Sequence, residues 1–263
     1  MSTNFDRRRI NGPEESSSPV FVDDDEDETK WRPGKPRQSR QPQDIRPIFL
    51  QLGLISQANG SAYIETERTK IACAVYYRYG PRQSKSTGYS ERGRLSVQVK
   101  FAPFSCHKRR APIRDAEDRS IAVLIHQSLV PSIRLELFPK STIDVFLTII
   151  ENDGIDSCVA TGTVAASTAL ADAGIEMLGL VMSCAATLMG EEIWLDPNHE
   201  EATAGASTLV LACMPALNVV TNVWQNGTMS TKEGRECMTA CQERCATMHS
   251  IVAQSLVSNF TPE

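Results

Sequence analysis

The sequence has no run of about 20 apolar residues, which a membrane-spanning helix would require. Its longest apolar stretch, residues 175–189, is interrupted by Glu176 and Ser183 and stops at Gly190. Residues 1–9 carry arginines and lead into Pro, Glu and Ser, so the apolar core of a secretory signal is missing too. We therefore expect a protein of a reducing compartment, with no membrane as a partner.

An excess of positive charge is also missing. The chain has 27 Lys and Arg against 32 Asp and Glu, a formal net charge of -5. Proteins that hold nucleic acid through their whole surface are basic, because phosphates attract cations. Any RNA contact of this chain must therefore be local.

Metal-ligand spacing is absent among the 8 cysteines. Cys237, Cys241 and Cys245 recur every four residues, which on a helix places their sulfurs along one stripe. One helix cannot fold three thiolates around a tetrahedral zinc ion, and there is no two-residue Cys spacing or His pair nearby. We expect free thiols on a buried face, no metal and no cofactor.

What is present fits one domain with a tail. The chain has 263 residues, of which 41% are hydrophobic. Residues 1–45 combine an acidic run, residues 23–28, with a Pro-rich basic stretch and few apolar side chains. We expect this tail to be disordered or draped on a partner, a domain over residues 46–258, and a short tail over 259–263.

Apolar periodicity predicts alternating strands and helices. Alternation or apolar character predicts strands, and a 3.6-residue period predicts helices over 115–129 and 158–172. The segment 158–172 carries no charge until its end, and Gly174 is its expected C-terminal cap. Ser230 and Glu233 form a capping box before a long last helix. The predicted strands are residues 47–54, 61–77, 95–101, 141–151, 178–188, 193–195, 207–216 and 219–224. The order indicates an α/β (α+β) protein with two sheets.

Several separated motifs resemble the ribonuclease PH family. Those of the first half are Arg46-Pro47-Ile48, Gly60-Ser61-Ala62-Tyr63, Thr69-Lys70 and Gly80-Pro81-Arg82. Those of the second half are Asp153-Gly154, Asp172-Ala173-Gly174-Ile175 and Leu195-Asp196. The resemblance covers about residues 46–258 and implies a ribonuclease PH-like fold of two mixed sheets with packed helices.

Further segments resemble the family members that form the ring of the RNA exosome. They are residues 8–16, 53–58, 109–112 and 214–218. The resemblance implies a hexameric ring with other ribonuclease PH-like subunits, a cap subunit docked on it, RNA threaded through its channel, and presence in nucleus, nucleolus and cytoplasm.

In active members of this family, the phosphate-binding segment looks like Asp-Gly-Gly-Thr-Arg. Here that run is Asp153-Gly154-Ile155-Asp156-Ser157, so Asp156 replaces Thr and Ser157 replaces the phosphate-binding Arg. A carboxylate about 4 Å from a phosphate costs roughly 1 kcal/mol per charge in water and more at lower dielectric. The sequence predicts a site that cannot hold phosphate.

A second pattern of active members is Leu-Asp with another Asp six residues on. Asp196 matches the first Asp and Ala202 occupies the second position, while Glu200 and Glu201 lie nearby but shifted. We interpret Asp196 as a solvated turn aspartate before Pro197. No catalytic residue is therefore assigned: Asp156, Ser157, Asp196 and Ala202 are degenerate positions.

Two basic clusters could line an RNA path, because cations track phosphates without reading bases. One consists of Arg82, Lys85, Arg92 and Arg94, and the other of His107, Lys108, Arg109, Arg110 and Arg114. The alternative, a solvated surface, has equal weight for each cluster. The chosen candidates are Arg82, Arg94, Lys108, Arg109 and Arg110.

These features favour a non-catalytic structural subunit of the exosome ring, supporting 3′-to-5′ RNA processing and degradation. One alternative is an active phosphate-dependent 3′-to-5′ exoribonuclease using Asp196 or Glu200. Another is a standalone RNA-binding module, which would be a stable monomer.

Overall fold

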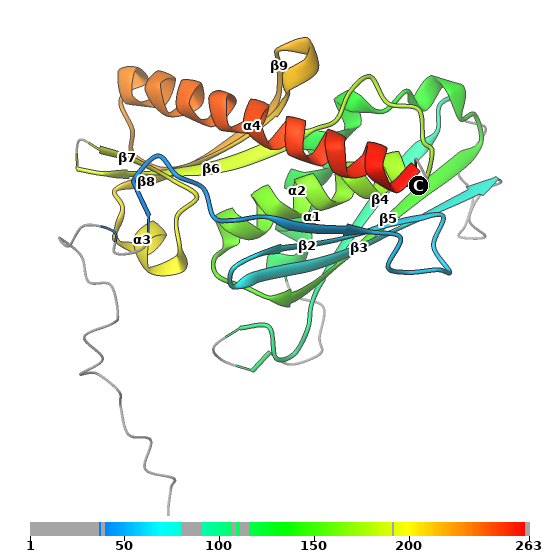
Figure 1. The fold of residues 1–263 in the computed structure, drawn as a ribbon, viewed down its shortest axis with the longest axis horizontal. Coiled ribbons are helices and arrows are strands. Elements are labelled where there is room, and N and C mark those ends of the chain that lie inside the picture. The colour runs from blue at the N-terminus through cyan, green and yellow to red at the C-terminus, as the bar shows by residue number, and fades with distance from the viewer. Residues whose placement is uncertain are drawn as a thin grey trace, which may run out of the picture.

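The computed structural model describes Arg37 and residues 40–79, 91–106, 109–110, 116–190 and 192–260. Within these residues the chain forms two sheets and four α-helices (Figure 1). Single turns of 3-10 helix occur at Val130–Ser132, Leu135–Leu137 and Pro215–Leu217. The predicted α/β class, with two sheets and packed helices, is confirmed.

The first sheet has five strands in the order β1-β2-β3-β5-β4. They are β1 (Phe49–Leu52), β2 (Gly60–Thr66), β3 (Thr69–Tyr79), β4 (Arg94–Phe101) and β5 (Ser141–Glu151). Its neighbours pair antiparallel except for β4 and β5, which run parallel. This sheet is therefore mixed, as expected.

The second sheet has four strands in the order β7-β6-β8-β9. They are β6 (Met182–Met189), β7 (Glu192–Leu195), β8 (Ser207–Met214) and β9 (Val219–Gly227). All of its pairings are antiparallel, which differs from the mixed sheet expected here. Short connections between successive strands allow this pairing without a crossover helix.

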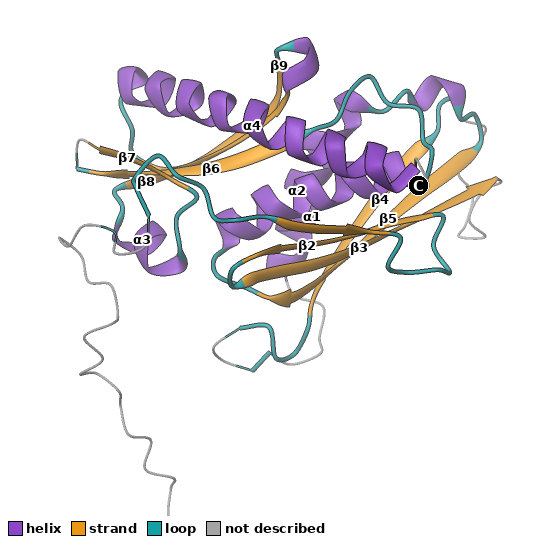
Figure 2. Ribbon diagram, viewed as in Figure 1, coloured by secondary structure: helices purple, strands orange, loops and turns teal. Residues whose placement is uncertain are grey.

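Helix α2 (Ile155–Asp172) is the centre of the core. It contacts β2 and β3 of the first sheet and β6 and β8 of the second, and Figures 1 and 2 show it between the sheets. Its small and apolar side chains let both sheets approach closely, so it is buried over nearly its whole length. It begins three residues before the predicted start at Cys158; Asp156 and Ser157 of this first turn are already buried, whereas Ile155 is 41% exposed.

Two further helices cover the rest of the core. Helix α1 (Ala116–Leu129) packs on β4, α2 and β9, while α4 (Thr231–Phe260) lies along β6 and β8. Cys237, Cys241 and Cys245 of α4 are all 0% exposed, so the striped face of the predicted last helix points into the core. The predicted capping box is present, since Ser230 and Glu233 exchange hydrogen bonds.

Gly60 explains how the first sheet meets α2. Gly60, which opens the motif Gly60-Ser61-Ala62-Tyr63, is the first residue of β2. A Cβ atom there would lie 2.2 Å from the backbone nitrogen of Ala173. The glycine is needed for close approach of two backbones rather than for a turn.

The ends of the domain extend beyond the predicted boundaries of 46 and 258. Most of residues 1–45, and 261–263, lie outside the described residues, but Arg37 and residues 40–45 pack on the domain. Helix α4 continues to Phe260. None of the helices in the described ranges has the length and apolar character needed to cross a membrane.

Candidate functional site

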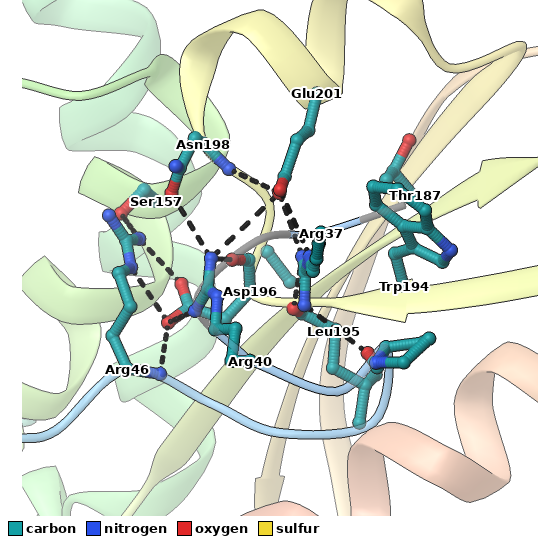
Figure 3. Close-up of polar contacts among 12 residues, drawn as sticks. Arg37, Arg40, Arg46, Ser157, Thr187, Trp194, Leu195, Asp196, Asn198 and Glu201 are labelled. Atoms are coloured by element: carbon teal, nitrogen blue, oxygen red, sulfur yellow. Dashed lines mark hydrogen bonds and ion pairs between the residues drawn. The ribbon is translucent and has the colours of Figure 1, made fainter. Parts of the chain in front are cut away.

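Arg46, just before β1, is the centre of the polar cluster at the expected site (Figure 3). Its backbone N–H and Nε donate to Asp196 Oδ2 at 2.9 and 2.8 Å. Nη2 donates to Asp196 Oδ1 at 2.5 Å and to Ser157 Oγ at 2.6 Å, and Nη1 lies 3.0 Å from Asp153 Oδ2. Arg46 is only 1% exposed, so this guanidinium is sealed among its partners.

The pair of Arg46 and Asp196 is ionised. Burial alone would lower the pKa of Arg46, but the hydrogen bond and charge of Asp196, with the charge of Asp153, raise it. Burial alone would raise the pKa of Asp196, yet the hydrogen bonds and charge of Arg46, followed by the charge of Arg40, lower it. The interpretation of Asp196 as a solvated turn aspartate is wrong, because its side chain is only 16% exposed and is bound by arginine.

A second arginine-rich contact lies beside the first. We name Arg37 and residues 40–46 the arginine strap. Arg37 donates from Nε and Nη2 to the two carboxylate oxygens of Glu201, at 3.0 and 2.8 Å. Its Nη2 also donates to the Leu195 carbonyl at 2.8 Å, and its guanidinium lies 5.0 Å from the centre of the Trp194 ring. The strap therefore closes over the end of β7 and α3 (His199–Ala204).

Arg40 joins the two halves of this cluster. Its Nη2 donates to the Asp196 carbonyl at 2.7 Å and to Asn198 Oδ1 at 3.1 Å, and Nη1 lies 3.4 Å from Asp196 Oδ2. The Leu195 backbone N–H also donates to the Pro42 carbonyl at 2.8 Å. Strap and second sheet are thus joined by main-chain and side-chain bonds.

The two residues that replace Thr and Arg point to different partners. Ser157 is 1% exposed and shares hydrogen bonds with Arg46 and with Thr69 Oγ1, at 3.0 Å. Asp156 is 9% exposed and bonds to the Thr208 hydroxyl of β8; burial raises its pKa and that bond partly offsets the rise. The carboxylate expected to face an anion thus turns toward the second sheet, and Asp153 and Asp196 supply the negative charge beside Ser157.

The remaining degenerate position is in α3. Ala202 donates its N–H to the Asn198 carbonyl at 2.8 Å and has no polar side chain. Its neighbour Glu201 is 4% exposed and accepts from the Asn198 N–H at 3.0 Å while holding Arg37. Glu201 is therefore occupied in capping α3 and holding the strap, whereas Glu200 is exposed.

A small cavity borders the Arg46–Asp196 pair, and a larger pocket of about 610 Å³ is lined by residues 41–44 of the strap and Leu195. The cavity lined by Arg46, Asp196, Thr66 and Thr161 has a volume of about 30 Å³, which is room for about one water. The Thr66 hydroxyl oxygen, which belongs to a residue lining this cavity, has no hydrogen-bond partner among the described residues. Among the described residues no group of His, Cys, Asp and Glu has the geometry to hold a metal ion.

The proposed RNA-contacting residues that the structure describes differ in exposure. Arg94, at the start of β4, and Arg109 are exposed, while Arg82 and Lys108 lie outside the described residues. Arg110 is half-buried: it lies 4.1 Å over the Phe101 ring, bonds Glu117 at 2.5 Å and lies 3.7 Å from Asp118. Its charge is therefore largely used inside the domain.

Sequence patterns did not reveal the role of the strap arginines, and they indicated Glu201 only as a shifted neighbour of Ala202. Arg46 entered only as part of a motif marking the start of the first sheet, and Arg37 and Arg40 as basic residues of a tail. No local pattern marks these arginines, because their carboxylate partners lie more than 100 residues away in the chain.

Comparison with known proteins shows the family to which the chain belongs. Residues 44–176 match the model described as 3′ exoribonuclease family, domain 1. The exosome complex component MTR3 of Homo sapiens is 36% identical over 269 aligned residues, covering 96% of this chain and 94% of that protein. The chain belongs to the 3′ exoribonuclease (ribonuclease PH) family. The MTR3 protein of Schizosaccharomyces pombe is also 36% identical, over 86% of this chain and 85% of its own length.

Other members of the 3′ exoribonuclease family are similar as well. The exosome complex component Rrp41 of Pyrococcus horikoshii is 40% identical over 76% of this chain and 79% of its own. The crystal structure of rice Rrp46 superposes with a TM-score of 0.70 at 21% identity, covering 85% of this chain and 99% of that one. A chain of the Archaeoglobus fulgidus exosome with RNA bound to the active site gives 0.70 at 17% identity, covering 80% and 90%. These structural likenesses show a shared fold.

Proposed function

We propose that this chain is a non-catalytic subunit of the RNA exosome ring, of the MTR3 type. The supporting observation is the closed site. Ser157 occupies the position at which the motif of active members has Arg. The neighbouring guanidinium of Arg46 is held by Asp153, Ser157 and Asp196. Similarity to human and S. pombe MTR3 over most of the chain supports the assignment to that type.

Phosphorolysis needs phosphate bound beside the last linkage and an acid near the leaving oxygen. Arg46 is already bound by carboxylates, and the cavity beside it has room for about one water. Asp196 remains an ionised partner of arginine and is a poor proton donor. The chain therefore contributes shape and surface rather than chemistry.

A ring subunit needs broad contact surfaces, and β9 offers one. It is an edge strand of the second sheet, so one side of its backbone is unpaired within the described residues. Val219, Val220 and Val223 of β9, with Leu217 of the turn before it, are 39–51% exposed. Such an apolar edge fits a neighbouring ribonuclease PH-like subunit better than solvent.

RNA and a cap subunit are the further proposed partners. The exposed Arg94 and Arg109 could follow the phosphates of a threaded strand, as could Arg82 and Lys108. Presence in nucleus, nucleolus and cytoplasm remains part of the proposal and rests on the family resemblance.

The decisive experiment is an assay of phosphate-dependent release of nucleoside diphosphates from a 3′ RNA tail. We expect the purified chain to release no nucleoside diphosphates. A reconstituted ring should release the same amount with Asp196→Ala as with the parent chain. Robust release by the chain, abolished in Asp196→Ala, would show instead an active phosphorolytic exoribonuclease.

Assembly is tested separately by size-exclusion chromatography and pull-down with other ribonuclease PH-like subunits. We expect a stable complex whose formation is weakened by Val220→Asp on β9. A monomer that binds RNA and captures no ring subunit would instead show a standalone RNA-binding module.

A further inference from the structure

Two cysteines lie together on one face of the second sheet. Cys184 of β6 is opposite Leu211, and Cys213 of β8 is opposite Met182. Because side chains two apart on a strand share a face, Cys184 and Cys213 are diagonal neighbours across the two central strands. They are 3% and 4% exposed.

Helix α4 brings a second row of thiols to the same place. It lies along β6 and β8, and its Cys237, Cys241 and Cys245 follow one another at about 6 Å intervals along the helix axis. All three are 0% exposed. Five cysteines from three elements are therefore packed at a single helix–sheet interface.

The thiols of this interface are matched in pairs. Cys241 lies beside Cys184 and Cys245 lies beside Cys213, close enough for the thiols to shift one another's pKa. The neighbouring Cys245 lowers the pKa of the Cys213 thiol, whereas the neighbouring Cys213 and burial raise the pKa of Cys245 well above its usual range. Cys237, one turn earlier, lies beside Glu233 and Glu236, and burial raises its pKa.

We propose that Cys184–Cys241 and Cys213–Cys245 are two oxidisable dithiol pairs, which a peroxide converts into disulfides that fasten α4 to the central strands of the second sheet. All four are free thiols in the structure. No metal-binding geometry is found among the described residues, so oxidation rather than metal binding is the chemistry this cluster offers.

The reaction balances with hydrogen peroxide as the two-electron oxidant. The Cys213 sulfur attacks one peroxide oxygen, forming a sulfenic acid and releasing one water. The Cys245 sulfur then attacks that sulfenic sulfur, its proton leaves with the hydroxyl as a second water, and the S–S bond forms. A second peroxide oxidises Cys184 and Cys241 in the same way.

Burial makes the reaction slow, and this gives it a signature. Peroxide reaches these sulfurs only when α4 opens locally, so the rate should rise in mild denaturant that leaves the protein folded. Disulfides would close loops between distant parts of the chain, and the oxidised protein should melt at least about 5 °C higher than the reduced protein.

The test uses the full chain in a Cys106→Ser background, since Cys106 is the described thiol that is partly exposed. The folded protein is treated with hydrogen peroxide, alkylated under denaturing conditions, and examined by intact mass and by peptide mapping. We expect the loss of four hydrogen masses, linkages 184–241 and 213–245, and reversal by dithiothreitol.

Matched variants assign the pairs. Cys241→Ala and Cys184→Ala should each lose only two hydrogen masses and keep linkage 213–245, while the control Cys237→Ala should still lose four. If either variant of a pair fails to fold, the other reports on the same linkage. Any of three results would overturn the proposal. They are oxygen addition without cross-links, linkages other than 184–241 and 213–245, or four thiols that stay unmodified at temperatures where α4 opens.

Discussion

Arg46 donates to the Asp196 carboxylate from three nitrogens, its backbone N–H, Nε and Nη2. Breaking one side of a buried ion pair leaves the other charge uncompensated, which costs about 3–5 kcal/mol. We expect Arg46→Met to lower the free energy of unfolding by that amount in urea denaturation. The control Arg134→Met removes an exposed pair with Glu176 and should cost less than about 1 kcal/mol. Equal effects of the two substitutions would contradict the central role of Arg46.

Asp196 should make the protein sensitive to acid. Arginine contacts lower its pKa in the folded state, so its stabilisation is present above the ordinary carboxyl pKa and is lost as the pH falls through the lowered value. Asp196→Asn should therefore destabilise the protein at pH 7 and much less at pH 2, measured by denaturation at each pH. Glu136→Gln, an exposed partner of Arg92, serves as control. An equal loss at both pH values would show that the charge of Asp196 is not what stabilises the fold.

Asp156 should have the opposite effect. Its pKa is raised by burial, so its contribution to stability is present below the unfolded carboxyl pKa and is lost as the pH rises through the raised value. Asp156→Asn keeps a partner for the Thr208 hydroxyl and removes the buried charge. We expect a higher melting temperature than the parent at pH 7 and little difference at pH 3. A variant less stable at pH 7 would mean that the Asp156 charge has a favourable partner.

The strap is tested through Trp194. Its side chain is 5% exposed and lies under the Arg37 guanidinium. Removing a bidentate, buried partner of Glu201 should cost about 3 kcal/mol. In Arg37→Ala we expect that loss, a red-shifted tryptophan emission and faster amide exchange at residues 40–46. Arg92→Ala, whose pair with Glu136 is exposed, should change none of these. Unchanged exchange at 40–46 would show that the strap is held without Arg37.

The fold could be predicted from the sequence where one element carries one clear period. β5, with its alternating face, spans Ser141–Glu151 as predicted, and the Cys stripe of α4 is buried as predicted. Helix α3 was missed because its six residues are too few to show a helical period; Asn198 and Glu201 cap it locally, and Arg37 of the strap also holds Glu201. Short elements of this kind owe their stability to tertiary contacts, which periodicity does not reveal.

The site was predictable in composition but not in arrangement. Sequence alone indicated that Ser157 cannot supply a phosphate-binding charge. It could not indicate that Asp196 is held by Arg46, a partner 150 residues away, or that Asp156 turns to Thr208. Such pairings depend on long-range contacts between separate strands and helices, so local patterns carry no trace of them.

The basic residues offer a last separation between RNA contact and folding. Arg94 and Arg109 are exposed, whereas Arg110 is bound to Glu117 and stacked on Phe101. In a reconstituted ring, Arg94→Ala and Arg109→Ala should weaken binding of single-stranded RNA, each reducing the salt dependence by about one phosphate contact, without changing the melting temperature. Arg110→Ala should instead cost about 1 kcal/mol of stability and leave the salt dependence unchanged. If Arg110→Ala weakened RNA binding as much as Arg109→Ala while stability stayed constant, the pair with Glu117 would have to open in the ring, and Arg110 would belong to the RNA path.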